Sequence, residues 1–365
     1  MKKALIACGG TGGHLSPGVA VAERLIELGY RCELLISKKQ VDSRLVGKYE
    51  AFEYDSIPGS ALSLSPIRFG KFSYNLLSGI VKCIRKIRRE KPDVVIGFGG
   101  FLSMPALFAG YVCGVPVAIH EANRVPGRVT RMVSRFATRI YLPEGIEMSI
   151  RKPARIINLG MPVRSEIQKR DPIEAKRVLG LNEGFNTLLV FGGSQGAQSL
   201  TNWVAEHQSS LGKLGWQVYC LTGSQGGEDR EEVVRLEEGG ELKTLYRTFS
   251  DYMATVLSAA DLVVSRAGAG SISEIVRCEV PAILIPYPFA ADDHQQANAK
   301  RFVEQGGGVA IDQSELGQLF ELVRDVVSDA ERMDSFRTSL KAMGTERPQV
   351  QIGADLEGLV EAKRR

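Results

Sequence analysis

The sequence predicts an α/β protein of two Rossmann-like domains, each a doubly wound parallel sheet, facing each other across a cleft. Nearly every candidate strand is a continuous run of Val, Ile and Leu, as a strand buried on both faces requires. Candidate helices alternate with these strands along the chain. Each half opens with an apolar strand that stops at Gly-Gly-Thr/Ser-x-Gly, near Gly9 and near Gly192. The period of this weak repeat is too long for a solenoid, so it predicts two similar domains.

The first half begins with an apolar run at residues 3–8, which stops at the glycine-rich turn of residues 9–14. Val19, Leu25 and Ile26 then continue a helical pattern. A strand, a glycine-rich turn and a helix together form the start of a βαβ unit. The same reasoning predicts the other strands of this half at residues 32–36, 93–97, 115–120 and 139–142.

The second half repeats this order, beginning with a strand at residues 186–191 and the turn Gly192-Gly193-Ser194-Gln195-Gly196. Its other strands are predicted at residues 216–221, 262–265 and 282–286. The boundary between the domains is expected near residues 158–164. The predicted division is therefore 1–160, 161–345 and a C-terminal segment, 346–365. Ligands of such folds bind at the carboxyl ends of the strands, so the cleft between the domains is the expected site.

The composition is that of an ordinary globular protein, with 44% hydrophobic and 24% charged residues in a chain of 365. Its six cysteines form no CxxC motif and no Cys/His cluster, which predicts thiols in a reducing compartment and no metal site. No run of about 20 apolar residues is present to span a membrane. The N-terminal apolar run is too short for a signal peptide, so a cytoplasmic location is expected.

The net charge of +4 is unevenly distributed. Residues 1–160 contain 24 Lys and Arg against 12 Asp and Glu, whereas the rest of the chain contains 22 against 30. A basic half of this kind suits an anionic ligand or surface.

The basic charge is concentrated in residues 66–91, where eight basic residues accompany one acid and apolar residues recur every three or four positions. This pattern has three interpretations. The segment is a core-packed helix with a solvated basic face, or a helix held on anionic lipid headgroups, in part by Phe69 and Phe72. The third interpretation, a nucleic-acid surface, has no recognition motif to support it, so no nucleic-acid partner is expected.

The glycine-rich turns supply the first chemical signal. Their backbone N–H groups can approach a phosphate closely, and the dipole of the following helix adds to the attraction. Neither turn is a Walker A motif or a clean GxGxxG. Residues 37–39 place Ser-Lys-Lys after the second strand where NAD sites have an acid, which disfavours NAD and leaves NADP open. A third glycine-rich strand end, at residues 97–100, favours anion binding over the alternative that the glycines only permit tight turns.

Three of the four histidines stand at strand ends or helix starts. For His14, His120 and His294 a functional role and a structural role are equally expected. His207 lies among polar residues and is expected on the surface.

Several motifs, taken in this order, resemble those of the MurG family, the peripheral-membrane N-acetylglucosaminyltransferases of peptidoglycan synthesis. They are GGTGGHLSPGVAVAERL, GFGGFLSMPA, HEANRVPGR, GMPVR, GGSQGAQSLTN, SRAGAGSISEI and DDHQQANA, within residues 3–310. The resemblance implies a two-domain GT-B fold and a reaction without metal or cofactor. It implies inverting transfer of GlcNAc from UDP-GlcNAc to the muramyl 4-hydroxyl of undecaprenyl-pyrophosphoryl-MurNAc-pentapeptide (lipid I), which gives lipid II for cell wall synthesis.

The same resemblance implies a role for each part of the chain. Residues 1–160 would bind the acceptor and the membrane, residues 161–345 would bind the UDP-sugar, and residues 346–365 would pack back on the first domain. It also implies a peripheral location on the cytoplasmic face of the inner membrane, where residues 66–91 would meet an anionic surface.

Donor-site residues also follow from the resemblance. Glu274 corresponds to the acid that holds the ribose hydroxyls, and an ionised carboxylate can accept two hydrogen bonds there. Two departures, Ala267 in place of the usual Ser and Met161 in place of the usual Asn, affect individual contacts more than the reaction class. The residues implied to bind substrate are Thr11, Gly12, Gly13, Asn123, Arg164, Ser194, Ser250, Ala269, Gly270, Ser271, Glu274, Gln295 and Gln296.

Inverting transfer needs a general base on the acceptor side, which is the first domain. His14 follows the first glycine-rich turn, and the ordinary pKa of histidine near ~6.5 suits proton acceptance at neutral pH. The competing base is Glu121, and His14 would then bind a phosphate of the acceptor instead. Two other functions stay open: a soluble UDP-GlcNAc 2-epimerase-like enzyme, and a non-catalytic sugar-nucleotide-binding subunit.

Overall fold

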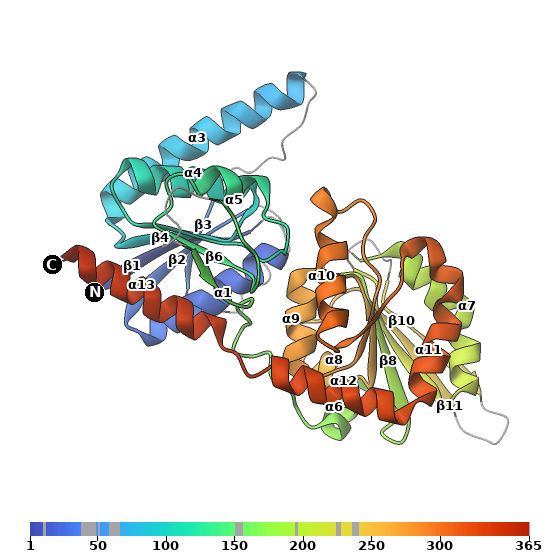
Figure 1. Cartoon of the computed structure of the whole chain (residues 1–365). Coiled ribbons are helices and arrows are strands. Elements are labelled where there is room, and N and C mark those ends of the chain that lie inside the picture. The colour runs from blue at the N-terminus through green and yellow to red at the C-terminus, as the bar shows by residue number, and fades with distance from the viewer. Residues whose placement is uncertain are drawn as a thin grey trace. The chain divides into compact units, whose positions relative to one another are not determined.

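The computed structural model describes residues 1–9, 12–37, 49, 52–57, 66–149, 156–193, 196–223, 228–235 and 241–364 (Figure 1). The chain forms two compact units. Unit 1 contains Met1–Ser165 and Arg347–Arg365, and unit 2 contains Glu166–Glu346. The C-terminal residues therefore belong to the unit in which the chain begins.

Unit 1 contains a seven-stranded sheet with the order β3-β2-β1-β4-β5-β6-β7, and all of its neighbouring strands pair in parallel. Its strands are β1 (Lys2–Ala7), β2 (Tyr30–Ile36), β3 (Glu53–Ser56), β4 (Val94–Gly97), β5 (Val117–His120), β6 (Arg139–Leu142) and β7 (Ile156–Asn158). Helices cover both faces of the sheet, as its continuous apolar strands require (Figure 1). These helices are α1 (Gly12–Glu27), α3 (Pro66–Glu90), α4 (Gly100–Val112), α5 (Arg128–Val133) and α13 (Pro348–Arg364).

Unit 2 contains a second seven-stranded sheet, with the order β10-β11-β9-β8-β12-β13-β14. Its strands are β8 (Asn186–Phe191), β9 (Trp216–Leu221), β10 (Arg230–Arg235), β11 (Glu241–Arg247), β12 (Leu262–Ser265), β13 (Ala282–Leu284) and β14 (Gly308–Ala310). Its α-helices are α6 (Pro172–Leu179), α7 (Gln198–Lys213), α8 (Met253–Ser258), α9 (Ala269–Cys278), α10 (His294–Glu304), α11 (Leu319–Ser328) and α12 (Ala330–Met343). Only β10 runs antiparallel to its neighbour among these described strands. The predicted fold class, two Rossmann-like parallel sheets, is confirmed.

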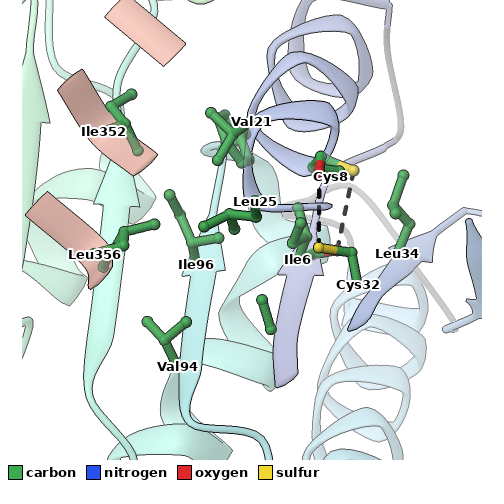
Figure 2. Packing of buried hydrophobic residues seen from close by; sticks show 14 of the residues in the cluster. Ile6, Cys8, Val21, Leu25, Cys32, Leu34, Val94, Ile96, Ile352 and Leu356 are labelled. Carbon is green, nitrogen blue, oxygen red and sulfur yellow. Dashed lines mark hydrogen bonds between the residues drawn. The ribbon is translucent and has the colours of Figure 1, made fainter. Parts of the chain in front are cut away.

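The C-terminal helix α13 completes the core of unit 1. Its apolar positions recur every four residues, and Ile352, Leu356 and Val360 are buried in one cluster with residues of α1. Figure 2 shows Ile352 and Leu356 on the side of this cluster that faces Val21 and Leu25. The helix is therefore a structural part of unit 1.

Polar contacts fix the register of α13 on the sheet. The Asp355 carboxylate accepts hydrogen bonds from Tyr141 Oη at 2.7 Å and from Arg139 Nε at 3.1 Å. Burial and the nearby Asp355 carboxylate raise the pKa of Tyr141 well above its ordinary value. The Lys2 ammonium group donates to Glu357 at 2.9 Å. These bonds join the last helix to β1 and β6.

We expect Leu356→Ala to lower the free energy of unfolding by about 2–5 kcal/mol, because it removes a fully buried side chain and leaves a cavity. Gly358→Ala on the exposed side of the same helix is the matched control, since a Cβ there meets nothing within 4 Å. That control should raise stability by about 0.5–1 kcal/mol through helix propensity. Equilibrium urea unfolding measures both. An unchanged midpoint for Leu356→Ala would show that α13 does not contribute to the core.

Candidate functional site

In unit 1, the candidate site residues lie at the carboxyl ends of three neighbouring strands. Strand β1 pairs with β4, and β4 pairs with β5. The strand order reverses between β1 and β4, and ligands of doubly wound sheets bind at such a switch point. The chain segments that follow these strands carry His14, the Gly99-Gly100 turn and residues 120–123.

The half-buried His14 is the third residue of α1, and its ring lies against the turn between β4 and α4. A Cβ built on Gly100 would lie 3.2 Å from His14 Cε1, and one built on Gly99 would lie 3.4 Å from His14 Nε2. Two of the glycine-rich strand ends therefore meet at this histidine. Thr11, which precedes α1, lies outside the described residues, whereas Gly12 and Gly13 are the first two residues of the helix.

His120 occupies a different environment from His14. It is buried at the end of β5, and its ring lies 5.5 Å from that of Phe98. Burial lowers the pKa of His120 to about 4, so its ring is neutral at physiological pH. The nearby His14 ring contributes to the same lowering of the His120 pKa.

The Glu121 carboxylate is engaged in ordering the loop that follows β5. Its Oε1 accepts hydrogen bonds from the backbone N and side-chain Nδ2 of Asn123, at 3.0 and 3.3 Å. Its Oε2 accepts from Gly127 N at 2.8 Å and from Thr130 Oγ1 at 2.6 Å. Both oxygens of this buried group thus hold residues 121–130 in place. The Glu121 carboxylate is thus fully engaged in structural hydrogen bonds.

The Arg164 side chain is buried within unit 1. The next residue, Ser165, donates its backbone N–H to Glu23 Oε2 of α1 at 2.8 Å. Residues 164–165 are thereby attached to the helix that carries His14.

In unit 2, the strand order reverses between β8 and β12. Two helices begin after these strands, α7 at Gln198 and α9 at Ala269. Ser194 lies outside the described residues. Ala269, Gly270 and Ser271 form the first turn of α9, where free N–H groups and the helix dipole attract anions. Glu274 lies one turn further along the same helix and is half-buried.

The other predicted donor residues of unit 2 are positioned by local hydrogen bonds. Ser250 Oγ accepts from Tyr252 N at 3.1 Å. On α10, Gln295 Oε1 accepts from Tyr287 N at 2.9 Å, which leaves the Gln295 amide NH₂ to donate. The neighbouring Gln296 donates from Nε2 to Asp312 at 3.3 Å.

His294 has a local structural role. Its Nδ1 lies 2.7 Å from the Ala291 carbonyl oxygen, within the short helical turn that precedes α10. His207 is sandwiched between Trp203 and Phe320, with ring centroids 5.2 and 5.4 Å away. It is therefore half-buried against α7 and α11, whereas the sequence predicted a surface position.

Arg266 belongs to the SRAGAGSISEI motif, but it was not among the residues implied to bind substrate. Its buried guanidinium donates to the carbonyl oxygens of Ile285 and Pro286, at 3.3 and 3.4 Å, and to Ser199 Oγ at 3.1 Å. It also donates to Gln313. No carboxylate among the described residues pairs with it, so its charge is uncompensated there. Its position directly after the buried strand β12 is the sequence signal that marks it.

Within the part of the chain that the structure describes, no three or more His, Cys, Asp and Glu residues are grouped as metal ligands. No helix among the described residues is long and apolar enough to cross a membrane.

Known families match both units. The N-terminal domain of glycosyltransferase family 28 matches residues 4–142, and its C-terminal domain matches residues 187–350. A relative from Opitutus terrae is 46% identical over 94% of this chain and 91% of its own length. It is named a UDP-N-acetylglucosamine--N-acetylmuramyl-(pentapeptide) pyrophosphoryl-undecaprenol N-acetylglucosamine transferase.

This chain belongs to the MurG family. The family predicted from the motifs is thus confirmed. A MurG relative of the same name from Sinorhizobium fredii is 35% identical over 98% of this chain and 94% of its own length. The crystal structure of MurG from Acinetobacter baumannii covers 98% of this chain and 100% of that chain, with a TM-score of 0.73 at 21% identity. At this identity the structure shows the MurG fold alone.

The fold is not specific to MurG proteins. A structure assigned as a UDP-N-acetylglucosamine 2-epimerase from Listeria monocytogenes covers 97% of this chain and 94% of its own, with a TM-score of 0.67 at 14% identity. The choice between transferase and epimerase therefore depends on sequence, and at 35–46% identity the Opitutus and Sinorhizobium relatives carry the transferase name.

Proposed function

We propose that this protein transfers GlcNAc from UDP-GlcNAc to the muramyl 4-hydroxyl of lipid I, with inversion, and so forms lipid II for peptidoglycan synthesis. The observation that carries this proposal is the 46% identity to a named transferase over 94% of the chain, across both units. The donor binds to unit 2 and the acceptor to unit 1.

The geometry of unit 2 suits a uridine diphosphate group. The N-termini of α7 and α9 and the guanidinium of Arg266, which pairs with no carboxylate of the described residues, supply positive potential near the ends of β8 and β12. This potential stabilises the diphosphate as it leaves, without proton transfer to it. The Glu274 carboxylate accepts hydrogen bonds from the ribose hydroxyls. The amide NH₂ of Gln295 donates a hydrogen bond to the sugar.

On the acceptor side, His14 is the general base. A neutral imidazole removes the proton from the muramyl hydroxyl as that oxygen attacks the anomeric carbon from the face opposite UDP. Glu121 holds the neighbouring loop instead, since its two oxygens already accept four hydrogen bonds.

Incubation with UDP-[¹⁴C]GlcNAc, with and without lipid I, tests the reaction. The transferase gives labelled lipid product only when lipid I is present. Release of UDP with free N-acetylmannosamine would show the epimerase, and UDP-GlcNAc binding without turnover would show a non-catalytic subunit. Either result would reject the proposal.

We also infer that unit 1 binds the anionic cytoplasmic face of the inner membrane. Helices α3, α4 and α5 form the outer layer on one side of its sheet (Figure 1). Exposed apolar side chains on this layer are Tyr74, Leu77, Val81, Phe108, Tyr111, Val112 and Met132. Exposed basic side chains on the same helices are Lys71, Lys82, Arg85, Arg88, Arg89, Arg128 and Arg131. Apolar contact combined with basic charge suits a peripheral lipid surface.

The structure corrects two details of the expected lipid-facing stripe. Phe72 is buried and packs edge-on against Phe101, with ring centroids 5.3 Å apart, so it faces the protein core. Lys86 is also buried, where it pairs with Glu33 and with Asp55. The side chain of Phe69 lies outside the described residues. The lipid-facing surface of α3 is therefore carried by Leu77 and Val81, together with Arg85 and Arg88.

We expect the double variant Arg85→Glu/Arg88→Glu to weaken binding to phosphatidylglycerol vesicles by more than about tenfold at low salt, since each basic residue near the surface contributes about 1 kcal/mol. Both side chains are exposed and form no ion pair with the described residues. The control variant Lys213→Glu/Lys341→Glu lies in unit 2 and changes the net charge by the same amount. It should leave vesicle binding unchanged. Vesicle co-sedimentation measures both, and equal losses in the two variants would reject a specific surface on α3.

A further inference from the structure

The turn between β4 and α4 combines two unusual properties. Gly99 and Gly100 both have left-handed backbone angles, with φ of +76° and +66°. A Cβ on Gly100 would also lie 3.2 Å from Cε1 and 3.3 Å from Nδ1 of His14. Such distances are tighter than ordinary van der Waals contact, so the imidazole occupies the space that a side chain would need.

The other end of α4 provides a direct comparison. Gly114 has a φ of +70°, yet a Cβ there would meet nothing within 4 Å. Its left-handed conformation alone explains why glycine suits that position. At Gly100 the backbone angle is almost the same, but the contact with His14 is an additional constraint.

This seat also determines the electrostatic environment of His14. The ring lies at the N-terminal end of its own helix, α1, and against Gly100, the first residue of α4. Helix N-termini carry partial positive charge. Helix α4 contains no Asp, Glu, Lys, Arg or His that would add a charged side chain next to the ring. The buried, neutral His120 at the end of β5 is a titratable neighbour of this ring.

We propose that the Gly99-Gly100 turn is the seat that positions His14 for proton transfer, and that Gly100 is a positioning residue because it has no side chain. The proposal rests on the proposed function, in which His14 is the base. A methyl group on Gly100 would displace the imidazole from the acceptor hydroxyl without touching the donor residues of unit 2.

Gly100→Ala and Gly114→Ala form a matched pair that tests this seat. Both place alanine at a left-handed angle, one at the start of α4 and one just beyond its end, so a similar loss of thermal stability is expected for both. Only Gly100→Ala displaces His14. We expect its kcat to fall by about tenfold or more, because small misplacements of a reacting group are costly. The KM for UDP-GlcNAc should not change, and kcat of Gly114→Ala should stay within about twofold of the parent.

Two further measurements separate positioning from general damage. The ring ¹⁵N signals of His14 and their titration midpoint should move in Gly100→Ala and stay unchanged in Gly114→Ala. In a His14→Ala background, Gly100→Ala should cause no further loss of kcat, since residues that act as one unit are not additive. If the His14 signals do not move in Gly100→Ala, or if the losses of kcat in the double variant are fully additive, the proposal that Gly100 positions His14 is wrong.

Different results would reject the positioning role of Gly100 and the role of His14 as general base. If Gly100→Ala behaves like Gly114→Ala while His14→Ala is still strongly impaired, His14 is the base and the seat is wrong. If His14→Ala keeps its turnover, the proposed role of His14 fails, and with it the reason for a seat.

Discussion

Replacing His14 by alanine should lower kcat by about 10²–10⁴-fold, the usual contribution of a general base. The acceptor hydroxyl must lose its proton as it attacks, and the other titratable groups described at the ends of β1, β4 and β5 are less suited to that task. His120 is buried and its pKa is lowered to about 4, while Glu121 is tied into its loop. The KM for UDP-GlcNAc should change little, because the donor residues that follow β8 and β12 are in unit 2.

The pH dependence of kcat distinguishes the two candidate bases. A base works only when deprotonated, so the rate should fall as the pH is lowered through the pKa of the base. This fall in kcat at low pH, the acid limb of the pH profile, should disappear in His14→Ala and persist in Glu121→Gln. The Glu121 variant should lose stability instead, since its amide NH₂ would face N–H and O–H donors that now meet a carboxylate oxygen. An acid limb that disappears only in Glu121→Gln would make Glu121 the base.

The sequence predicts the central strands of both sheets well and the marginal strands poorly. Residues 186–191 and 262–265 are continuous apolar runs, and they form β8 and β12 with the predicted bounds. The strands β3, β7, β10, β11 and β14 were not predicted, and all of them except β11, which lies next to an edge, are edge strands. An edge strand buries less of its surface, so β3 reads Glu-Tyr-Asp-Ser and β10 contains charged residues. Hydrophobic pattern alone carries little signal for such strands.

The candidate site shows a similar division. Motif order identifies the family and places His14 and Glu274 early in the helices that follow β1 and β12, because glycine-rich turns mark the starts of those helices in the sequence. Which partner a side chain finds depends on residues far along the chain. The buried position of Lys86 depends on Glu33 and Asp55 from β2 and β3, and Arg266 depends on Ser199 and Gln313 from other parts of unit 2. The local sequence pattern around Lys86 and Arg266 does not predict these long-range contacts.

The apolar face of α3 illustrates the same limit. This helix has apolar residues on more than one side, and periodicity alone does not choose which side packs on the sheet. Cys83 and Ile87 face the core, whereas Leu77 and Val81 are exposed. The choice is made by α4, whose Phe101 receives Phe72. The exposed residues of α3 that could face a membrane are therefore known only once the packing of α3 on α4 is known.

Replacing Glu274 by alanine should raise the KM for UDP-GlcNAc by about tenfold or more, since a hydrogen bond to a charged group contributes about 1.5–3 kcal/mol. The carboxylate lies one turn beyond the N-terminus of α9, where it can accept from the ribose while the first-turn N–H groups face the diphosphate. The ribose does not change during transfer, so the lost bond weakens donor binding in ground and transition states alike, and kcat at saturating donor should hold. Glu304→Ala on the exposed side of α10 is the matched control and should leave KM unaltered. Isothermal titration with UDP gives the same comparison without catalysis, and equal UDP affinity in the parent and Glu274→Ala would remove Glu274 from the donor site.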